Sequence, residues 1–233
     1  GNNSASTNTQ KNMQVATEHS LTFVPHFGNP NHSVMALLRG HISSSNNKSQ
    51  QQGVYGLPSG TFTSTALPGT ISQFSTGAGQ SRQVWALFQA HYAFKGKYIA
   101  DFTVRTDGST AFGDSRRWGT FPTVSLRWNI SDEPFIRDNA PWITMLSIRP
   151  SWGINGRAPG GDGLYYSKYS SGNSYLNIGT IYPNNIRLNK MQWEEAQQLN
   201  LGFDVGLFND KLTFDVNLYS KLTKKLLMNN YKI

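Results

Sequence analysis

Histidine is the residue type of this chain best suited to holding a metal ion. The five histidines are His19, His26, His32, His41 and His91. Metal sites usually draw their ligands from positions with short, characteristic spacings. These histidines fall on different expected strands without such spacing, and cysteine is absent, which excludes thiolate ligands and disulfides. We therefore expect polar or interfacial histidines and no metal site.

Two pairs of adjacent carboxylates and two glycine-rich stretches are the other candidates for chemistry. The carboxylate pairs are Asp132-Glu133 and Glu194-Glu195. Neighbouring residues of a strand point to opposite faces, so neither pair presents two carboxylates to one sugar, as a glycosidase requires. The glycine-rich stretches, residues 77–79 and 160–163, are not followed by an amphipathic helix, as a nucleotide-binding loop would be. We interpret them as loops, and we expect no catalytic residue, no enzyme activity and no cofactor.

Aromatic and cationic residues gather in or beside the segments expected to be long loops. They are Arg117, Trp118, Arg157, Tyr165, Tyr166, Lys168, Tyr169, Tyr175 and Trp193. Aromatic rings could stack on a sugar or hold a peptide, and arginine could contact a carboxylate or a hydroxyl. The alternative is that these side chains pack the loops against one another or against a partner. Both roles stay open for each residue.

Strict alternation of apolar and polar residues predicts the elements that position these groups. It is clearest in the segments that start at Tyr98, Leu199 and Leu212, and weaker copies include 83–92, 122–130 and 142–152. In a β-strand, alternate residues point to opposite faces, so each of these segments has one apolar and one polar face. With two further strands in 13–27 and 32–43, we expect about eight strands of roughly 10 residues, the length of a tilted transmembrane strand.

The expected connections alternate between short and long. The short ones are 28–31, 95–97 and 209–210, with an intermediate stretch at 131–141, and the long ones are 44–81, 108–119 and 154–197. Short turns on one side and long loops on the other are typical of a transmembrane β-barrel. The strand directions place both ends of the chain on the long-loop side. We therefore expect an interior piece of a longer barrel, or one of several pieces that together complete its wall.

Composition fits this interpretation. Charged residues make up 15% of the chain, against roughly 25% in ordinary soluble domains, while aromatic residues reach 12%. The net charge of +8 could suggest nucleic acid, but no run of five Lys or Arg occurs, so we expect a basic surface and no nucleic-acid partner. On the polar faces of the strands we expect charges that face the barrel lumen and pair with one another or hold a plug. These residues are Asp101, Arg105, Asp107, Arg127 and Arg149.

Three blocks of residues, in order, carry a resemblance to a known family. The first comprises Arg105, 107–109, 112–113, 117–125, Trp128, Ser131, Glu133 and Phe135; the second comprises 148–149, 151–153 and 155–156; and the third comprises 193–194, Asn200, Gly202, Asp204, 207–209, Asp215, Tyr219, Thr223 and 226–227. The chain resembles the SusC/RagA family of TonB-dependent outer-membrane transporters of Bacteroidota. Ala111, Arg127 and Pro150 depart from the family pattern. Trp118 lies in the first block, which favours a structural role for it.

The resemblance implies a fold and a function. It implies that residues 1–233 form part of one antiparallel, all-β transmembrane barrel domain, with about eight strands of a 22-stranded barrel, and that the plug domain and the TonB box lie outside this chain. It implies uptake of glycans or oligopeptides across the bacterial outer membrane, with a SusD-like surface lipoprotein, the TonB complex, the remaining barrel and plug segments, the lipid bilayer and lipopolysaccharide as partners. The loop 154–197 is expected to contribute to the lipoprotein interface. The alternative from another class is a soluble all-β carbohydrate-binding module, whose apolar strand faces would form a core.

Overall fold

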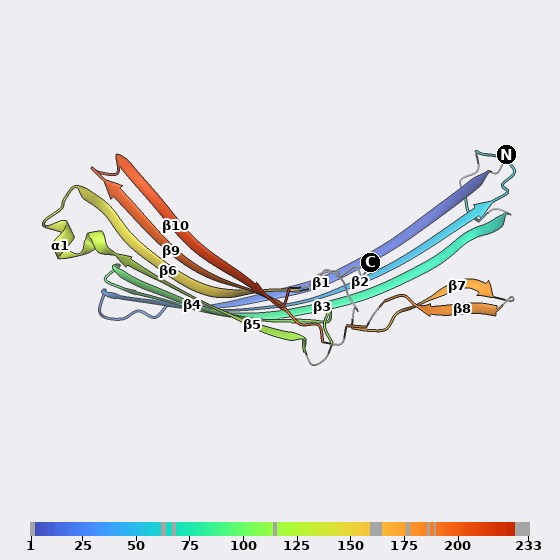
Figure 1. The fold of residues 1–233 in the computed structure, drawn as a ribbon, viewed down its shortest axis with the longest axis horizontal. Helices are drawn as coiled ribbons and strands as arrows, with labels where there is room; N and C mark the ends of the chain where they lie inside the picture. The colour runs from blue at the N-terminus through green and yellow to red at the C-terminus, as the bar shows by residue number, and fades with distance from the viewer. Residues whose placement is uncertain are drawn as a thin grey trace. The chain divides into compact units, whose positions relative to one another are not determined.

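The chain folds into antiparallel β-strands. The computed structural model describes residues 3–61, 64–66, 69–113, 116–158, 165–175, 178–185, 187–188 and 190–226. The main sheet has eight strands in the order β1-β2-β3-β4-β5-β6-β9-β10, and β7 and β8 form a separate two-stranded sheet (Figure 1). The strands are β1 (Ser4–Phe23), β2 (His32–Tyr55), β3 (Thr70–Phe94), β4 (Tyr98–Ser109), β5 (Trp118–Asn129), β6 (Ile143–Arg157), β7 (Tyr169–Tyr175), β8 (Ile178–Pro183), β9 (Glu194–Leu207) and β10 (Leu212–Lys224). The expected all-β fold with about eight strands is confirmed.

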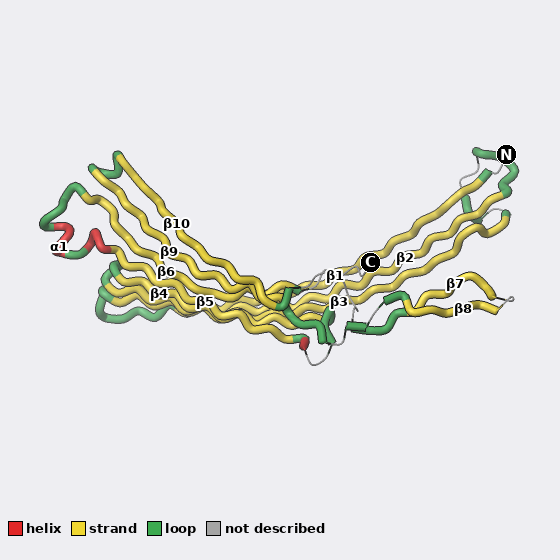
Figure 2. Tube along the Cα trace, in the orientation of Figure 1, coloured by secondary structure: helices red, strands yellow, loops and turns green. Residues whose placement is uncertain are grey.

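Helical structure in the described residues is confined to short segments between strands (Figure 2). The connection from β5 to β6 carries a 3-10 turn, η2 (Ile130–Asp132), and one turn of α-helix, α1 (Pro134–Arg137). Pro134 stands at the first turn of α1, where its missing N–H costs no hydrogen bond. No helix in the described part of the chain is long and apolar enough to cross a membrane.

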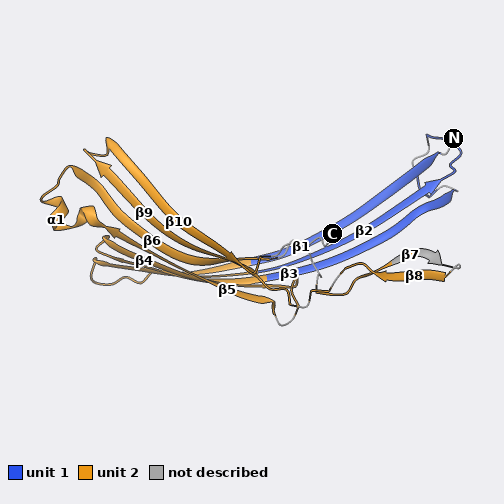
Figure 3. Ribbon diagram, viewed as in Figure 1, with its two compact units in different colours: residues 1–17, 42–83 blue, residues 18–41, 84–233 orange. Residues whose placement is uncertain are grey.

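The chain forms two compact units (Figure 3). Unit 1 comprises residues 1–17 and 42–83, which contain the N-terminal part of β1, the C-terminal part of β2 and the N-terminal part of β3. Unit 2 comprises residues 18–41 and 84–233, with the remaining parts of those strands and all later elements.

Tight turns join the strands at one end of unit 2. Lys95 and Gly96 both have positive φ, 52° and 66°, and the N–H of Lys97 donates to the carbonyl oxygen of Phe94 at 3.0 Å. Two consecutive left-handed residues match the twist of a two-residue hairpin, and glycine adopts this conformation without steric cost. The turn between β9 and β10 also uses left-handed backbone, with φ near 60° at Asn209 and Asp210.

The expected long loop at 44–81 is wrong, because most of it is strand. β2 continues to Tyr55 and β3 begins at Thr70, so these strands have 24 and 25 residues. The missed parts are rich in Ser, Asn, Gln and Thr and carry no apolar face. A pattern search depends on such a face, whereas the backbone ladder needs none. Gly77-Ala78-Gly79, which we expected in a loop, therefore lies inside β3.

Candidate functional site

The two faces of the unit 2 sheet differ in chemistry, and the strand register shows this directly. Tyr98 pairs with Trp128, Trp128 with Ile148, and Ile148 with Phe203 across β4, β5, β6 and β9. Further rows of the same face run through Phe102, Val124, Trp152 and Leu199, and through Val205 and Phe214. The opposite face has the row Asp101, Ser125, Ser151, Asn200 and Tyr219. One face is thus apolar and the other is polar.

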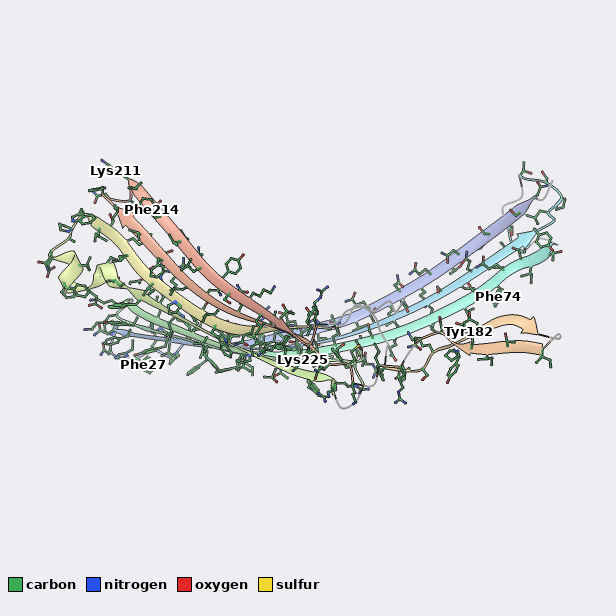
Figure 4. The ribbon with its side chains drawn as sticks, in the orientation of Figure 1. Phe27, Phe74, Tyr182, Lys211, Phe214 and Lys225 are labelled. Atoms are coloured by element: carbon green, nitrogen blue, oxygen red, sulfur yellow. The ribbon has the colours of Figure 1, made fainter. Side chains whose placement is uncertain are left out.

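The apolar face is exposed. Relative exposure is 41% at Phe102, 49% at Leu126 and 57% at Leu199, and Phe214 lies uncovered on β10 near the turn that holds Lys211 (Figure 4). In a soluble sandwich this face would form the core and be covered by a second layer. Among the described residues, the buried apolar side chains form only a small cluster near the loops and a few isolated positions. The face therefore requires an apolar environment from outside this chain.

The centre of the polar face is a cluster of ion pairs around Asp204. Its carboxylate accepts from Nη2 of Arg149 at 2.5 Å, from Nη2 of Arg127 at 3.3 Å and from the Ser147 hydroxyl at 2.7 Å. Asp204 is 8% exposed and Ser147 is 1% exposed. Arg149 also lies 3.5 Å from Asp215 of β10. Three strands, β5, β6 and β9, are thus tied together by one buried carboxylate.

A second group of charges lies on the same face, on β3 and β4. Arg105 donates two parallel hydrogen bonds to Asp107, each at 2.7 Å, and its guanidinium lies 4.6 Å from the ring centre of Trp85. The imidazole of His41 stacks on Trp85 with 5.4 Å between centroids. Oδ1 of Asp101 lies 2.7 Å from Nδ1 of His91 and accepts a hydrogen bond from it when that nitrogen carries the proton. Side chains of β2, β3 and β4 thus contact one another across the strands on this face.

All five residues expected to face a lumen lie on this polar face, and each has a partner within the sheet. Sequence reasoning did not include Asp204, His91 and Trp85 in that set. Asp204 could have been found, because it alternates with Asn200 and Gly202 on the polar face of its strand. The register across non-consecutive strands β6 and β9, which brings Asp204 opposite Ser147, has no comparable sequence signal.

Glu133 organises the turn end of the sheet. Its carboxylate accepts hydrogen bonds from the Tyr98 hydroxyl at 2.6 Å, the Trp128 indole at 3.3 Å and the Lys97 ammonium at 3.2 Å. The hydrogen bond from Tyr98, together with those from Trp128 and Lys97, lowers the pKa of Glu133 below its usual value. Glu133 therefore binds Tyr98, Trp128 and Lys97 at the turn end of the sheet, and Asp132 takes no part in these hydrogen bonds.

An aromatic cluster anchors the loops at the other end of the strands. The Phe112 ring is fully buried and lies 4.7 Å from the Trp193 ring, and Phe121 meets Trp193 edge-on at 5.6 Å. The Trp193 indole donates to the carbonyl oxygen of Arg117 at 3.2 Å. Trp193 is only 8% exposed. Its position matches the packing role that was considered for the loop aromatics, because neither face of the ring is free for a ligand.

The loop tyrosines are more accessible. The hydroxyl of Tyr165 donates to that of Tyr166 at 2.6 Å, which raises the pKa of Tyr165, and their ring centroids are 4.0 Å apart. Tyr166 is 56% exposed, and Tyr169, at the start of β7, is 64% exposed. Tyr175 lies at the end of β7, with its backbone paired to Ile178.

The remaining expected loop residues do not converge on one site. Arg157 is exposed at the end of β6, and its backbone pairs with Glu194. Lys168 is exposed, and its backbone N–H donates to the Asn185 side chain at 2.6 Å. Trp118 is 61% exposed and lies over Gly108 on the apolar face of the sheet, away from the polar face. Trp118 and Trp128 thus mark the two ends of the apolar face of β5.

The described residues contain no group of three or more His, Asp or Glu that could hold a metal ion. Residues 160–163 lie outside the described residues. The Glu194-Glu195 pair lies in β9, and Glu195 is ion-paired with Lys225.

Comparisons with known proteins agree with this arrangement. A family model described as TonB dependent receptor-like, beta-barrel matches residues 1–232. TonB-dependent receptor P39 of Formosa agariphila is 36% identical over 138 residues, which cover 59% of this chain and 13% of that protein. TonB-dependent receptor SusC of Bacteroides thetaiotaomicron is 35% identical over 153 residues, which cover 61% of this chain and 15% of that protein. The chain thus spans a small part of the length of these relatives.

A solved structure of the RagAB peptide transporter has the same fold. It superposes with a TM-score of 0.86 over 98% of this chain and 25% of that chain, at 19% sequence identity. The alternating faces, the turn and loop arrangement and these matches agree. The SusC/RagA resemblance is confirmed, and the chain belongs to the TonB-dependent receptor-like β-barrel family.

Proposed function

We propose that residues 1–233 form part of the wall of a single β-barrel domain in a TonB-dependent transporter of the bacterial outer membrane. The observation that carries this proposal is the pairing of an exposed apolar face with a polar face whose charges are mutually neutralised. Lipid would cover the first face, and an aqueous lumen would border the second. The plug domain and the TonB-contacting segment are assigned to parts of the protein outside these residues.

Two adjacent positions of β4 provide a test. Phe102 lies on the apolar face and Thr103 on the polar face, and this chain contains no cysteine. In outer membranes that contain the complete transporter, a water-soluble maleimide should label Thr103→Cys and spare Phe102→Cys. Equal labelling of both variants, or recovery of the folded protein in buffer without detergent, would overturn the membrane assignment and favour the soluble carbohydrate-binding alternative.

The partner in this proposal is a SusD-like surface lipoprotein that binds the long-loop side. Support comes from the family resemblance and from the β7–β8 hairpin, which exposes Tyr169, Ile178, Ile181 and Tyr182. Exposed aromatic and aliphatic side chains on a hairpin suit a protein interface. Replacing Tyr169–Pro183 by a short Gly-Ser linker should abolish copurification of the lipoprotein while the barrel still folds. Undiminished copurification would place the interface elsewhere.

The transported substrate class in this proposal is a glycan or an oligopeptide. Tyr166 and Tyr169 expose rings that can stack on a sugar or pack against a peptide side chain. The double variant Tyr166→Ala/Tyr169→Ala should reduce uptake more than it reduces lipoprotein copurification, because only Tyr169 of the two belongs to the proposed lipoprotein interface. An unchanged rate of uptake would exclude these two rings from substrate capture.

A further inference from the structure

The backbone pairing between β5 and β6 is interrupted at one position. The two strands pair on both sides of this position in one continuous register. That register would place Leu126 opposite Pro150 and Arg127 opposite Arg149, but neither pair forms in these two fully described strands. Proline has no N–H and cannot donate a hydrogen bond to the neighbouring strand. We call these four residues the seam.

The interruption is confined to the boundary between β5 and β6. On the other side of β5, Leu126 pairs with Ala100 of β4. On the other side of β6, Pro150 pairs with Leu201 of β9. Each strand is therefore held at this level by its outer neighbour, and only the backbone contact between β5 and β6 is missing.

Two like charges face each other across the seam. Arg127 and Arg149 are opposite in register on the polar face, where like charges destabilise the pairing of strands. A carboxylate from a third strand, Asp204 of β9, compensates for this repulsion. Nη2 of Arg149 lies 2.5 Å from its Oδ1, and Nη2 of Arg127 lies 3.3 Å from its Oδ2. Asp204 thus links two strands that have no backbone pair at this level.

The closed seam leaves two polar groups unsatisfied. Nε of Arg127 and Nε of Arg149 are both buried, and neither donates to an atom of the described residues. A buried donor without an acceptor is costly, because it has given up its hydrogen bond to water. Local separation of the two strands would return both groups to water. The ion pairs with Asp204 must therefore offset this cost to keep the seam closed.

The apolar side of the sheet is hollow at the same position. A depression of about 600 Å³ is lined by Leu126, Ile148 and Pro150, and Arg127 lines it as well. Arg127 thus belongs both to the ion pairs of the polar face and to the lining of this depression. A hollow contains few packed side chains to displace, so packing opposes separation of β5 and β6 less here than at a filled position.

We propose that the seam is a conformational device, at which β5 and β6 separate locally and the ion pairs of Asp204 hold them closed. Arg127 and Pro150 are two of the three positions that depart from the family pattern, and the structure brings both to the seam. The arginine side chains are partly exposed, 41% for Arg127 and 36% for Arg149, so salt screens their pairing with Asp204. Opening of the seam therefore depends on ionic strength. This device goes beyond the transport proposal and is independent of the solute and the partner that the wall serves.

Hydrogen–deuterium exchange of the complete transporter tests the proposal. Mass spectrometry would follow amide exchange in the peptides that contain Leu126 and Ile148. Asp204→Asn should accelerate this exchange about tenfold, because hydrogen bonds to a charged group stabilise more than neutral ones do. Pro150→Val supplies the missing N–H and should slow the exchange below the wild-type rate. In the Pro150→Val background, Asp204→Asn should accelerate exchange less than about threefold, because the two changes act on one contact.

A second measurement needs no variant at the seam. At about 1 M salt, charges are screened over about 3 Å, so exchange at Leu126 and Ile148 should be faster than at low salt. Exchange of the peptides from β10, which has a complete ladder with β9, should stay the same. Equal exchange at the seam in low and high salt would overturn the proposal.

Asp107→Asn is the matched control. It removes a carboxylate of the same face whose partner, Arg105, lies on its own strand, so it should leave exchange at the seam unchanged. Equal exchange in wild type and Asp204→Asn would overturn the proposal. The same acceleration by Asp204→Asn with and without Pro150→Val would also overturn it, because Asp204 would then stabilise the sheet in general. The maleimide labelling on β4 tests the membrane assignment separately, so failure of either proposal is recognised without the other.

Discussion

The ring of Phe121 lies directly over Gly156, so that a Cβ atom at position 156 would overlap it. Phe121 is in turn 6% exposed and packs against Trp193. Glycine on β6 is therefore what allows an aromatic residue of β5 to lie flat on the sheet and close the cluster beneath the loops. This is a packing requirement, since φ at Gly156 is not in the left-handed region.

Gly156→Ala should destabilise the barrel, because Phe121 must rotate away and break its contact with Trp193. Overpacking of this kind costs about 1–3 kcal/mol. The free energy of unfolding of the complete barrel in urea would measure the change. Gly40→Ala on β2 is the matched control, because a Cβ atom at Gly40 has no neighbour within 4 Å. Equal stability of the two variants would contradict the role of Gly156.

Asp204→Ala should be more damaging than Arg127→Gln. Removing Asp204 leaves Arg127, Arg149 and the buried Ser147 hydroxyl without their shared acceptor, which costs about 1–3 kcal/mol. Arg127→Gln leaves the shorter bond from Arg149 in place, so the loss should stay below about 1 kcal/mol for these partly exposed arginines. Urea unfolding of both variants tests the order, and a larger effect at Arg127 would contradict it.

Sequence alone predicted the strands that have two contrasting faces. Alternation located the strands around Phe102, Phe203 and Phe214, because period two is imposed by the pleat itself. It failed at residues 44–55 and 70–81, where polar residues occupy both faces and hydrogen bonding of the backbone maintains the strand.

The ion pairs of the polar face could also be predicted only in part from the sequence. The alternation of side chains along a single strand assigns Arg105 and Arg149 to the polar face. It does not say which residues of other strands they meet, because register depends on turns and on long connections. The structure alone therefore shows that β6 pairs with β9, although β7 and β8 lie between them in the sequence. This pairing gives Asp204 its central position among the charged residues.

Glu133→Gln should make the stability of the folded protein less dependent on pH in the acidic range. The pKa of Glu133 is lowered in the folded protein, chiefly by the Tyr98 hydrogen bond. A lowered pKa means that the stabilisation is present above the unfolded-state pKa and is lost as pH falls through the folded-state value. Wild type should therefore lose stability on acidification below the normal glutamate range, and Glu133→Gln should lose less. Asp138→Asn is the control, since its pair with Arg137 is solvent-exposed; the same change in both variants would contradict the assignment.

Trp193→Ala should loosen the loops, whereas Trp118→Ala should not. Trp193 is buried between Phe112 and Phe121, and truncating a buried tryptophan costs about 3–5 kcal/mol. Most of that loss should appear locally, because the cluster joins Phe112 and Arg117 to Met191 and Trp193, which precede β9. Limited proteolysis of the complete transporter in intact cells should therefore cleave Trp193→Ala faster in these segments. Trp118 lies on the exposed apolar face, so Trp118→Ala should keep the wild-type cleavage rate. Faster cleavage of Trp118→Ala than of Trp193→Ala would mean that the cluster does not hold the loops.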